Sequence, residues 1–589
     1  MFTIKIINIG KEDVLYVKEL NNYIFLRKQI QLDVNDGRIS KSKLLDIALK
    51  QSNEEYKRIN NIITSWEKIE NSHTTNKQSL YTLYMHPVRR CNYECEYCFA
   101  KKSNYLPSGE ISLETAKKAI DFMINDWGKE AKRYVVDLAG SGEPLLRFEF
   151  IKEIEKYCEV KRKETSKDIK IMFPSNGSLI SEENVEYFEK NNNILIGISI
   201  DGDETHNTNR KYKNSKKAFE STVNGIDLLK NRKVGLAATI THNNENVDEV
   251  YEYLYKRFDN ADAISLNVVR DFDKESKTSF YNIDISNLLK HYKILVDNIY
   301  KNVSEGNYEY IRKLLIGTDT LGIYLCRVLC KGVLYRKRCG VGSCLLAVDE
   351  KGDLYMCSVS NGDEHFKVGD IYNGIDYSKF DYFKNANVET NKYCRKCWAA
   401  YICSGECMVS AYLTHRRMDK PNEDMCKFRR DLIYLVIQFI AKIQLQQPER
   451  YKEILKIIKN KIFFESVIDS GIWALEEYLK YNKIETGYSE ILKQMKNTDL
   501  GTEPKEIIAV LSKYVEDVGA YKISDITKLE DMIYPAIAFI NKAKATYYEY
   551  VLICGIEKEN LIIRKQFSQK KDLVSKQYFI NEISDIVIC

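Results

Sequence analysis

Hydrophobic positions follow two alternating patterns along the middle of this chain. Six short runs rich in β-branched and aromatic residues are separated by segments with the apolar spacing of helices. The predicted strands are Leu83–Val88, Tyr134–Leu138, Ile169–Phe173, Ile194–Ile200, Gly235–Thr241 and Ile264–Val269, and the helices between them include Leu113–Asn125, Ser215–Lys230 and Asn246–Arg257. Strands that alternate with helices pair in parallel. Residues 81–310 are therefore predicted to form an α/β unit whose parallel sheet is curled into a partial barrel or left open.

The two ends of the chain have different patterns. Residues 1–75 contain three strand-like runs and two helical segments, namely Phe2–Ile9, Val14–Lys18, Tyr23–Val34, Ser42–Leu49 and Glu54–Ile69. They predict a small α+β module, which the polar segment Asn71–Ser79 links to the rest. Residues 431–589 return to helical patterns, with one late hairpin formed by Tyr548–Ile556 and Leu561–Phe567. We expect a mainly helical extension there, and its pattern indicates no role.

Length and charge narrow the class of protein. A chain of 589 residues is expected to form two to four domains. Lys plus Arg total 89 and Asp plus Glu total 84, a balance of +5 that favours neither nucleic acid nor an anionic membrane as partner. The N-terminus lacks the apolar core of a signal peptide, and the apolar run Leu432–Ile443 is shorter than the ~20 residues that span a bilayer. We expect a cytoplasmic protein.

The cysteines are numerous and clustered. Of the 16, three lie at 91–98 and ten between 326 and 426. Disulfides are rare in a reducing compartment, so clustered cytosolic cysteines favour metal binding.

The first cluster consists of Cys91, Cys95 and Cys98, directly after the first predicted strand. Three thiolates on one short loop can hold three irons of a [4Fe–4S] cluster and leave the fourth open to an external ligand. The carboxyl end of a barrel strand is where barrel enzymes place reactive groups. The alternative is a zinc site with a distant fourth ligand.

This cysteine spacing, with Tyr97 before the last cysteine, resembles the motif of the radical S-adenosylmethionine (SAM) superfamily. Three later segments, each after a predicted strand, resemble other motifs of that family: Gly140-Ser141-Gly142-Glu143-Pro144, Pro174-Ser175-Asn176-Gly177, and Ser199-Ile200-Asp201-Gly202 with His206 and Arg210. The resemblance implies a partial (β/α)6 TIM barrel that binds SAM and generates a 5′-deoxyadenosyl radical. It implies SAM contacts at Tyr97, Gly140, Gly142, Glu143, Asn176, Ser199 and Arg210. No catalytic residue beyond the radical-generating cluster is predicted.

The second cysteine region resembles the SPASM domain, an extension of radical SAM enzymes that binds two auxiliary [4Fe–4S] clusters. The pattern is Cys339, Gly352 and Cys357, then Cys394-x2-Cys397-x5-Cys403-x3-Cys407, then Cys426. The resemblance implies one cluster on Cys339, Cys357, Cys407 and the eighth candidate Cys344, and one on Cys394, Cys397, Cys403 and Cys426. Residues 311–430 would form this domain, and the chain would hold three [4Fe–4S] clusters. Paired zinc knuckles are the alternative.

Branches of this family differ in the substrate that they modify, and two sequence features favour one branch. Sulfatase maturases place an Asp directly after the third cysteine of this region, where this chain has Ser358. The segments around Cys91 and Cys357 look closer to enzymes that modify ribosomally made peptides. In that branch residues 1–75 would be a winged-helix-like module that binds a leader peptide by strand addition; a structural cap is the alternative.

The implied function is oxidative modification of a ribosomally synthesised precursor peptide by hydrogen abstraction and thioether or other crosslink formation. A Cys-rich precursor peptide is a candidate substrate, and a small reductant protein such as flavodoxin or ferredoxin would supply electrons. The alternatives are another SPASM oxidoreductase, similar to sulfatase maturases, and a zinc-stabilised peptide-binding protein without redox chemistry.

Overall fold

The structure is a computed structural model of the chain. It describes residues 2–588 apart from 10–12, 27–35, 72–79, 103–108, 130, 166, 215–217, 271–282, 318, 466–473, 476–477, 480, 483, 485–503, 516–517, 523–528, 531, 533, 541–548, 566–571 and 584–585. The predicted linker and the second half of the predicted strand Tyr23–Val34 lie almost wholly outside the described residues.

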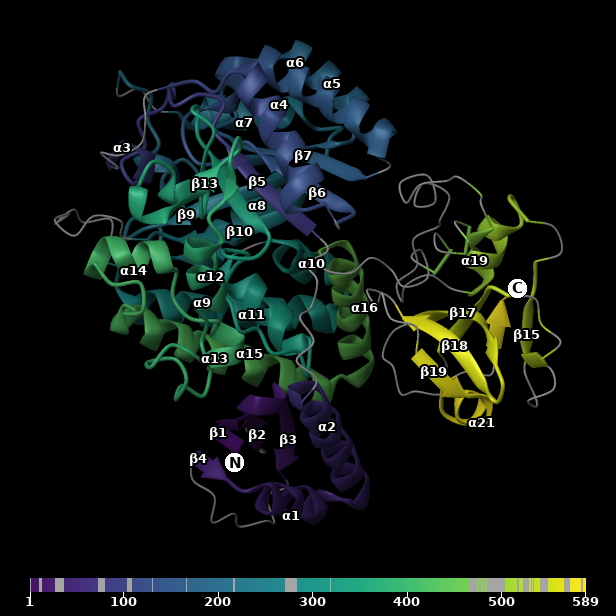
Figure 1. Ribbon diagram of the computed structural model, residues 1–589. Coiled ribbons are helices and arrows are strands. Elements are labelled where there is room, and N and C mark those ends of the chain that lie inside the picture. Colours follow the sequence, from purple (N-terminus) through teal and green to yellow (C-terminus); the bar gives the residue numbers. More distant parts are fainter. Residues whose placement is uncertain are drawn as a thin grey trace.

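A parallel sheet forms the centre of the molecule (Figure 1). Its strands are β5 (Leu80–Met85), β6 (Arg133–Asp137), β7 (Asp168–Ser175), β8 (Ile194–Ser199), β9 (Val234–Ile240) and β10 (Ala261–Val268), each beside the next in chain order. The intervening helices are α4 (Leu113–Phe122), α5 (Phe148–Thr165), α6 (Glu182–Lys190), α7 (Phe219–Leu228) and α8 (Val247–Arg257). The predicted α/β core with six strands is confirmed.

The cysteine-rich region continues this sheet beyond β5. Strand β11 (Leu345–Val348) pairs in parallel with β5, and β12 (Asp353–Tyr355), β13 (Lys367–Asp370) and β14 (Gly374–Ile375) follow in antiparallel order. The helices around this region are α9 (Ile285–Glu305), α10 (Tyr308–Ile316), α11 (Thr320–Leu329), α12 (Tyr377–Asn385), α13 (Ala400–Cys403), α14 (Met408–His415), α15 (Glu423–Gln446) and α16 (Pro448–Glu465). The sheet therefore joins the two cysteine regions through one backbone ladder.

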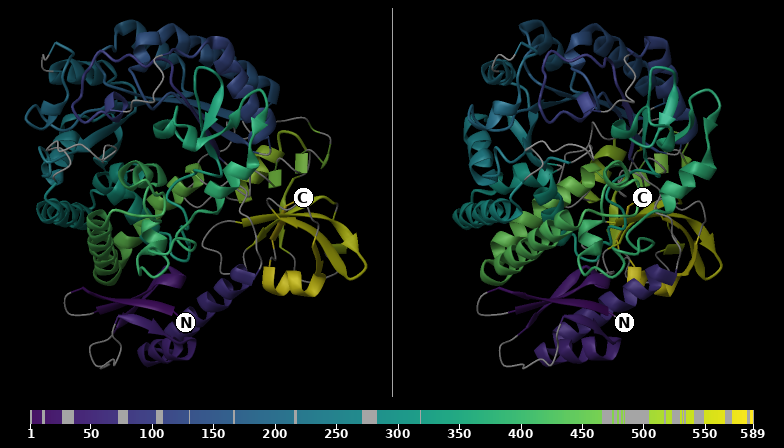
Figure 2. Two further views of the ribbon diagram at one scale, coloured as in Figure 1. Left: turned by 60° about the vertical axis from the view of Figure 1, so that its left-hand side comes forward. Right: turned by 90° about the vertical axis from the view of Figure 1, so that its left-hand side faces the viewer.

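The N-terminal sheet contains β1 (Phe2–Asn8), β2 (Asp13–Val17), β3 (Asn22–Leu26) and β4 (Gly37–Ile39), in the order β3-β2-β1-β4. Alternate side chains of β2 pack into two different hydrophobic cores. Leu15 and Val17 pack with α1 (Lys41–Gln51) and α2 (Asn53–Asn71), whereas Val14 and Tyr16 join the main core. Figures 1 and 2 show the sheet beneath the barrel, on the side of α15. Strand β4, which the sequence did not predict, forms one edge.

Polar contacts hold the N-terminal sheet against the cysteine-rich region. The buried Asn21 amide donates to the carbonyl oxygens of Arg327 at 3.0 Å and Val333 at 2.9 Å. Lys18 Nζ donates to the carbonyl oxygen of Arg395, which lies between Cys394 and Cys397, at 2.7 Å. The N-terminal sheet is thus fixed close to the second group of cysteines.

The C-terminal end corrects the expectation of a mainly helical extension. After α15, α16 and the later α19 (Pro504–Leu511), six strands form an antiparallel sheet in the order β15-β20-β16-β17-β18-β19. They are β15 (Ala520–Lys522), β16 (Ala536–Ile540), β17 (Glu549–Glu557), β18 (Asn560–Lys565), β19 (Asp572–Ser575) and β20 (Ile586–Ile588). The predicted late hairpin is confirmed as β17 and β18. Strands of three to five residues offer too few positions for an alternating pattern.

Figure 1 shows this sheet standing apart from the barrel, beyond α16. No helix among the described residues is long and apolar enough to cross a membrane.

Candidate active site

The loop of Cys91, Cys95 and Cys98 begins six residues after β5 ends. Its backbone is tied to the segment that follows β8, because Glu94 N donates to the Lys211 carbonyl at 2.7 Å and Glu96 N to the Asn209 carbonyl at 3.0 Å. The loop and Arg210 are therefore held side by side.

The three thiols lie in one half-buried neighbourhood. Burial raises the pKa of Cys95 to about 11, the Arg210 guanidinium opposes this, and charge on Cys98 and Cys91 adds to it. Burial also raises the pKa of Cys91, although Tyr93 N and Asn176 Nδ2 donate to its sulfur at 3.4 and 3.8 Å. Thiolates crowded in this way are stable when shared cations neutralise them, which is what an iron–sulfur cluster provides.

The turn after β6 comes very close to the cysteine loop and requires glycine. Gly140 has φ +132°, and a Cβ there would lie 1.8 Å from His86 Nε2. Gly142 has φ +73°, and a Cβ there would lie 2.0 Å from the Val88 carbonyl oxygen. Positive φ and close backbone approach both favour glycine.

Glu143 is buried at the end of this turn. Its carboxylate accepts hydrogen bonds from Asn176 N at 2.8 Å, Ser175 Oγ at 2.9 Å and Leu145 N at 3.1 Å. Burial raises the pKa of Glu143, and these donors oppose the shift. A carboxylate fixed by three donors retains lone pairs for a ligand ammonium group.

Arg210, Tyr97 and Asp201 form a buried chain. Arg210 Nη1 donates to the Tyr97 hydroxyl at 2.8 Å, and that hydroxyl donates to Asp201 Oδ2 at 2.6 Å. Asp201 lies two residues after Ser199, which ends β8. Arg210 Nε is buried and has no hydrogen-bond partner among the described residues. An unpaired buried guanidinium N–H is costly unless a ligand accepts from it.

These groups fit SAM. Glu143 suits its ammonium group, and the unpaired Nε of Arg210 suits its carboxylate. The His86 side chain opposite Gly140 and the backbone opposite Gly142 leave no room for a Cβ at either position. Asp201 was not among the predicted contacts. Its position inside the Ser199–Gly202 segment is the signal that could have identified it.

Four thiols of the cysteine-rich region influence one another, namely those of Cys339, Cys344, Cys357 and Cys407. Burial raises the pKa of Cys357 to about 12, with Cys407 and Cys339 adding to the shift. Burial raises the pKa of Cys344 to about 11, and Cys339 adds to it. Three of the four, all except Cys344, line a cavity of about 630 Å³.

Cys394, Cys397, Cys403 and Cys426 form the other group. Burial raises the pKa of Cys394 to about 12, and charge on the other three adds to the shift. All four line a cavity of about 300 Å³. The thiols thus gather around two spaces, and both suit a cluster with cysteine ligands. Among the described residues, no three His, Cys, Asp or Glu side chains are arranged to hold a single metal ion.

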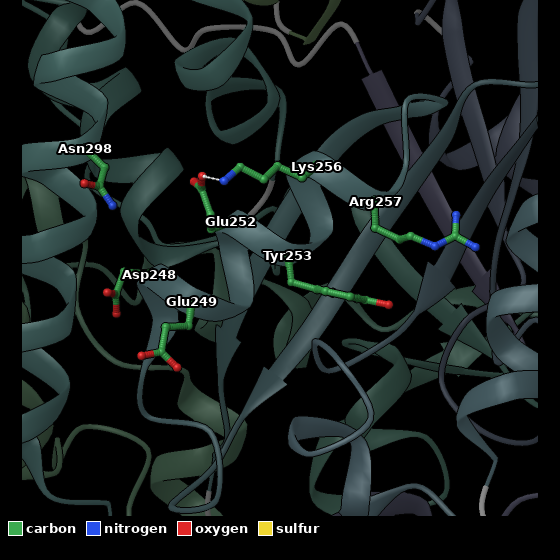
Figure 3. Close-up of a pocket in the computed structure, with 7 residues that line it drawn as sticks. All are labelled: Asp248, Glu249, Glu252, Tyr253, Lys256, Arg257 and Asn298. Atoms are coloured by element: carbon green, nitrogen blue, oxygen red, sulfur yellow. Dashed lines mark ion pairs between the residues drawn. The ribbon is translucent and has the colours of Figure 1, made fainter.

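A third hollow, of about 520 Å³, lies on the outside of the barrel between α8 and α9 (Figure 3). Its charged side chains are largely paired. Glu252 contacts Lys256 at 2.7 Å, Arg257 contacts Asp227 at 2.5 Å, and Asp248 contacts His291 at 2.6 Å. These pairs are typical of a solvated helix surface, and the hollow contains none of the predicted site residues.

Two family models match the chain. The Radical SAM superfamily model matches residues 85–254, and the Peptidase C39 family model matches residues 460–589, hereafter the C-terminal module. The sequence patterns did not predict the second match.

Curated relatives match part of the chain. An uncharacterised protein of Methanocaldococcus jannaschii is 29% identical over 286 residues, which cover 47% of this chain and 92% of the relative. The serine-type anaerobic sulfatase-maturating enzyme of Bacteroides thetaiotaomicron is 26% identical over 372 residues, which cover 54% and 80%.

A solved structure supports the fold. The enzyme anSMEcpe, with bound AdoMet and Cp18Cys peptide, aligns with a TM-score of 0.51 at 20% identity, covering 64% of this chain and 99% of that one. Such a likeness shows a shared fold over this part of the chain.

Proposed function

We propose that this chain, a radical SAM enzyme that acts on a peptide or protein, oxidatively modifies a ribosomally synthesised precursor peptide. The observation that carries the proposal is the convergence of Cys91, Cys95 and Cys98 with Arg210 and its unpaired Nε.

Each group of residues would have a separate role in this reaction. Cys91, Cys95 and Cys98 would hold the radical-generating cluster, and Glu143, Asn176 and Arg210 would orient SAM. The two other cysteine groups would hold auxiliary clusters, so the chain would contain three [4Fe–4S] clusters. When bound, these groups supply a 5′-deoxyadenosyl radical that removes a hydrogen atom from a substrate C–H bond, and an acceptor for the electron left when a thioether or other crosslink forms.

The large cavity argues for crosslinking without a carboxylate base. Its described lining contains two carboxylates. Glu406 accepts from both terminal nitrogens of Arg429 at 2.8 and 2.9 Å, and Asp419 pairs with Arg417 at 2.8 Å. Ser358 lies in the same lining, where sulfatase maturases are expected to have Asp. Neither carboxylate is therefore free to act as a base in this cavity.

Oxidation of a sulfatase side chain is the second candidate, because the Bacteroides relative is a sulfatase-maturating enzyme. The two functions are separated by incubating the reduced, cluster-loaded enzyme with SAM and each peptide in turn. A candidate precursor peptide, translated from a short open reading frame sought beside the gene, should lose two hydrogens per crosslink in mass spectra. A sulfatase-derived peptide should stay unchanged, and its conversion to formylglycine in place of crosslinking would refute the proposal.

The N-terminal sheet is proposed to bind the leader of that peptide at β4. Gly37 and Arg38 are exposed, and β4 is a three-residue edge strand. At the other edge, Arg58 Nη2 already donates to the Tyr23 carbonyl at 3.0 Å. An extended peptide would add to the open edge. Hydrogen exchange of the β4 amides should slow when the precursor peptide is added, while α1 serves as the unchanged reference; unchanged exchange at β4 would show that the sheet is a cap.

A further inference from the structure

The C-terminal module matches a peptidase family but contains no histidine. All seven histidines of the chain lie between positions 73 and 415, before the module begins. Cysteine and serine nucleophiles of peptidases depend on an adjacent base, which is histidine in the common pairs. The thiols of the module, Cys554 and Cys589, have no histidine within it to activate them. The module therefore lacks the machinery of histidine-dependent peptide cleavage.

The sheet of the module has its own cores, separate from the main core. Ala536, Val551 and Val587 pack on one side of the sheet, in a cluster with Phe579. Residues of opposite parity, such as Leu552, pack on the other side with α19. None of these residues belongs to the main core. The module is thus built as a distinct body.

One cross-strand row of side chains on this sheet, formed by Gly555, Ile562 and Leu573, is not covered by other described residues at either end. Gly555 of β17 pairs with Ile562 of β18, and Ile562 pairs with Leu573 of β19, so the three lie on one face. A Cβ at Gly555 would meet no described atom within 4 Å. Ile562 is half-buried, and the Leu573 side chain is 57% exposed on an edge strand. An apolar row that ends at a strand edge with no partner among the described strands suits the addition of an extended peptide.

We propose that the C-terminal module binds, without cutting, an extended segment of the precursor peptide along β19, with an apolar side chain of the peptide beside Leu573, at the edge of the row that Ile562 and Gly555 continue. This inference rests on the proposed function. The peptide is the occupant because the module matches a family whose members take peptide chains as substrates and because it shares a chain with a peptide-modifying site. Binding there raises the effective concentration of the peptide at the cysteine site.

The test uses the full-length, cluster-loaded enzyme and the same candidate precursor peptide, labelled with fluorescein. Leu573→Glu places a charge in the open row. It should weaken binding about tenfold in fluorescence anisotropy, because a buried leucine contact is lost. Tyr521→Glu is the matched control, since Tyr521 is 49% exposed on β15, the opposite edge strand. It should bind as tightly as the unaltered enzyme, and no cleavage fragments of the peptide should appear within a day.

Two results would overturn the inference and leave the proposed function intact, provided that crosslinked product still forms. One is that Leu573→Glu binds the peptide as tightly as the unaltered enzyme. The other is that the unaltered enzyme produces peptide fragments that Cys554→Ala does not, because such fragments would show cleavage by the module. An unaltered enzyme that cleaves SAM but neither binds nor modifies the peptide would overturn the proposed function, and the inference with it.

Discussion

Replacing Arg210 by Ala should weaken SAM binding by about 30-fold or more. Its side chain is 6% exposed, and its Nε has no partner among the described residues. Removing one member of a buried charge pair costs about 2–5 kcal/mol, which corresponds to at least a 30-fold change in Kd. Arg210→Lys keeps the positive charge but loses the planar guanidinium group. Its Kd for SAM should therefore lie between those of the unaltered enzyme and of Arg210→Ala.

The fold of the site should survive this change. Asp201 would keep the Tyr97 hydroxyl at 2.6 Å and the Thr239 N–H at 2.9 Å, so no buried carboxylate is left without donors. Iron content should therefore stay unchanged while the Kd rises.

The assay is anaerobic equilibrium dialysis with labelled SAM, with iron measured on the same samples. Arg257→Ala is the control, because Arg257 forms a partly exposed surface pair with Asp227 and should leave the Kd unaltered. An unchanged Kd in Arg210→Ala at full iron content would show that the SAM carboxylate lies elsewhere.

Three further predictions concern the glycine turn, the first auxiliary cluster and the N-terminal sheet. Gly140→Ala should abolish SAM binding, because its Cβ would lie 1.8 Å from His86, whereas Gly332→Ala, at φ +85° with open space, should bind SAM normally; equal binding would refute the steric argument. Cys344→Ala should open an iron site, so that a thiol peptide alters the electron paramagnetic resonance spectrum of the variant only; a change in the unaltered enzyme would show an open iron from the start. Asn21→Gly should lower the free energy of unfolding by about 1–3 kcal/mol in urea titrations, because the four hydrogen bonds of the Asn21 side chain are lost, and a change near zero would mean that they contribute little.

The sequence predicted the barrel well because its strands carry strong local patterns. In β9, for example, Val234, Leu236, Ala238 and Ile240 are all buried at alternate positions. The sequence pattern did not predict strands β11 and β12, because each has at most four residues. Strand β11 also depends on pairing with β5, which is far away in the chain. Local periodicity contains no information about such distant pairing.

The candidate site was only partly predictable. Motif order predicted Glu143 and Arg210 as SAM contacts, but the link through Tyr97 to Asp201 depends on how two distant loops meet. The docking of Asn21 onto the cysteine-rich region is likewise a tertiary contact between residues more than 300 positions apart. In the C-terminal module, Ile- and Lys-rich runs fit helix and strand alike, and tertiary packing decides between them.

The most direct test of the central claim is the triple variant Cys91→Ala/Cys95→Ala/Cys98→Ala. Three [4Fe–4S] clusters correspond to about twelve irons per chain. The triple variant should lose about four of them and all reductive cleavage of SAM, measured as 5′-deoxyadenosine after addition of dithionite. Cys158→Ala, which removes a buried thiol of the main core, should lose neither. Formation of 5′-deoxyadenosine by the triple variant would contradict the assignment of this loop as the radical-generating site.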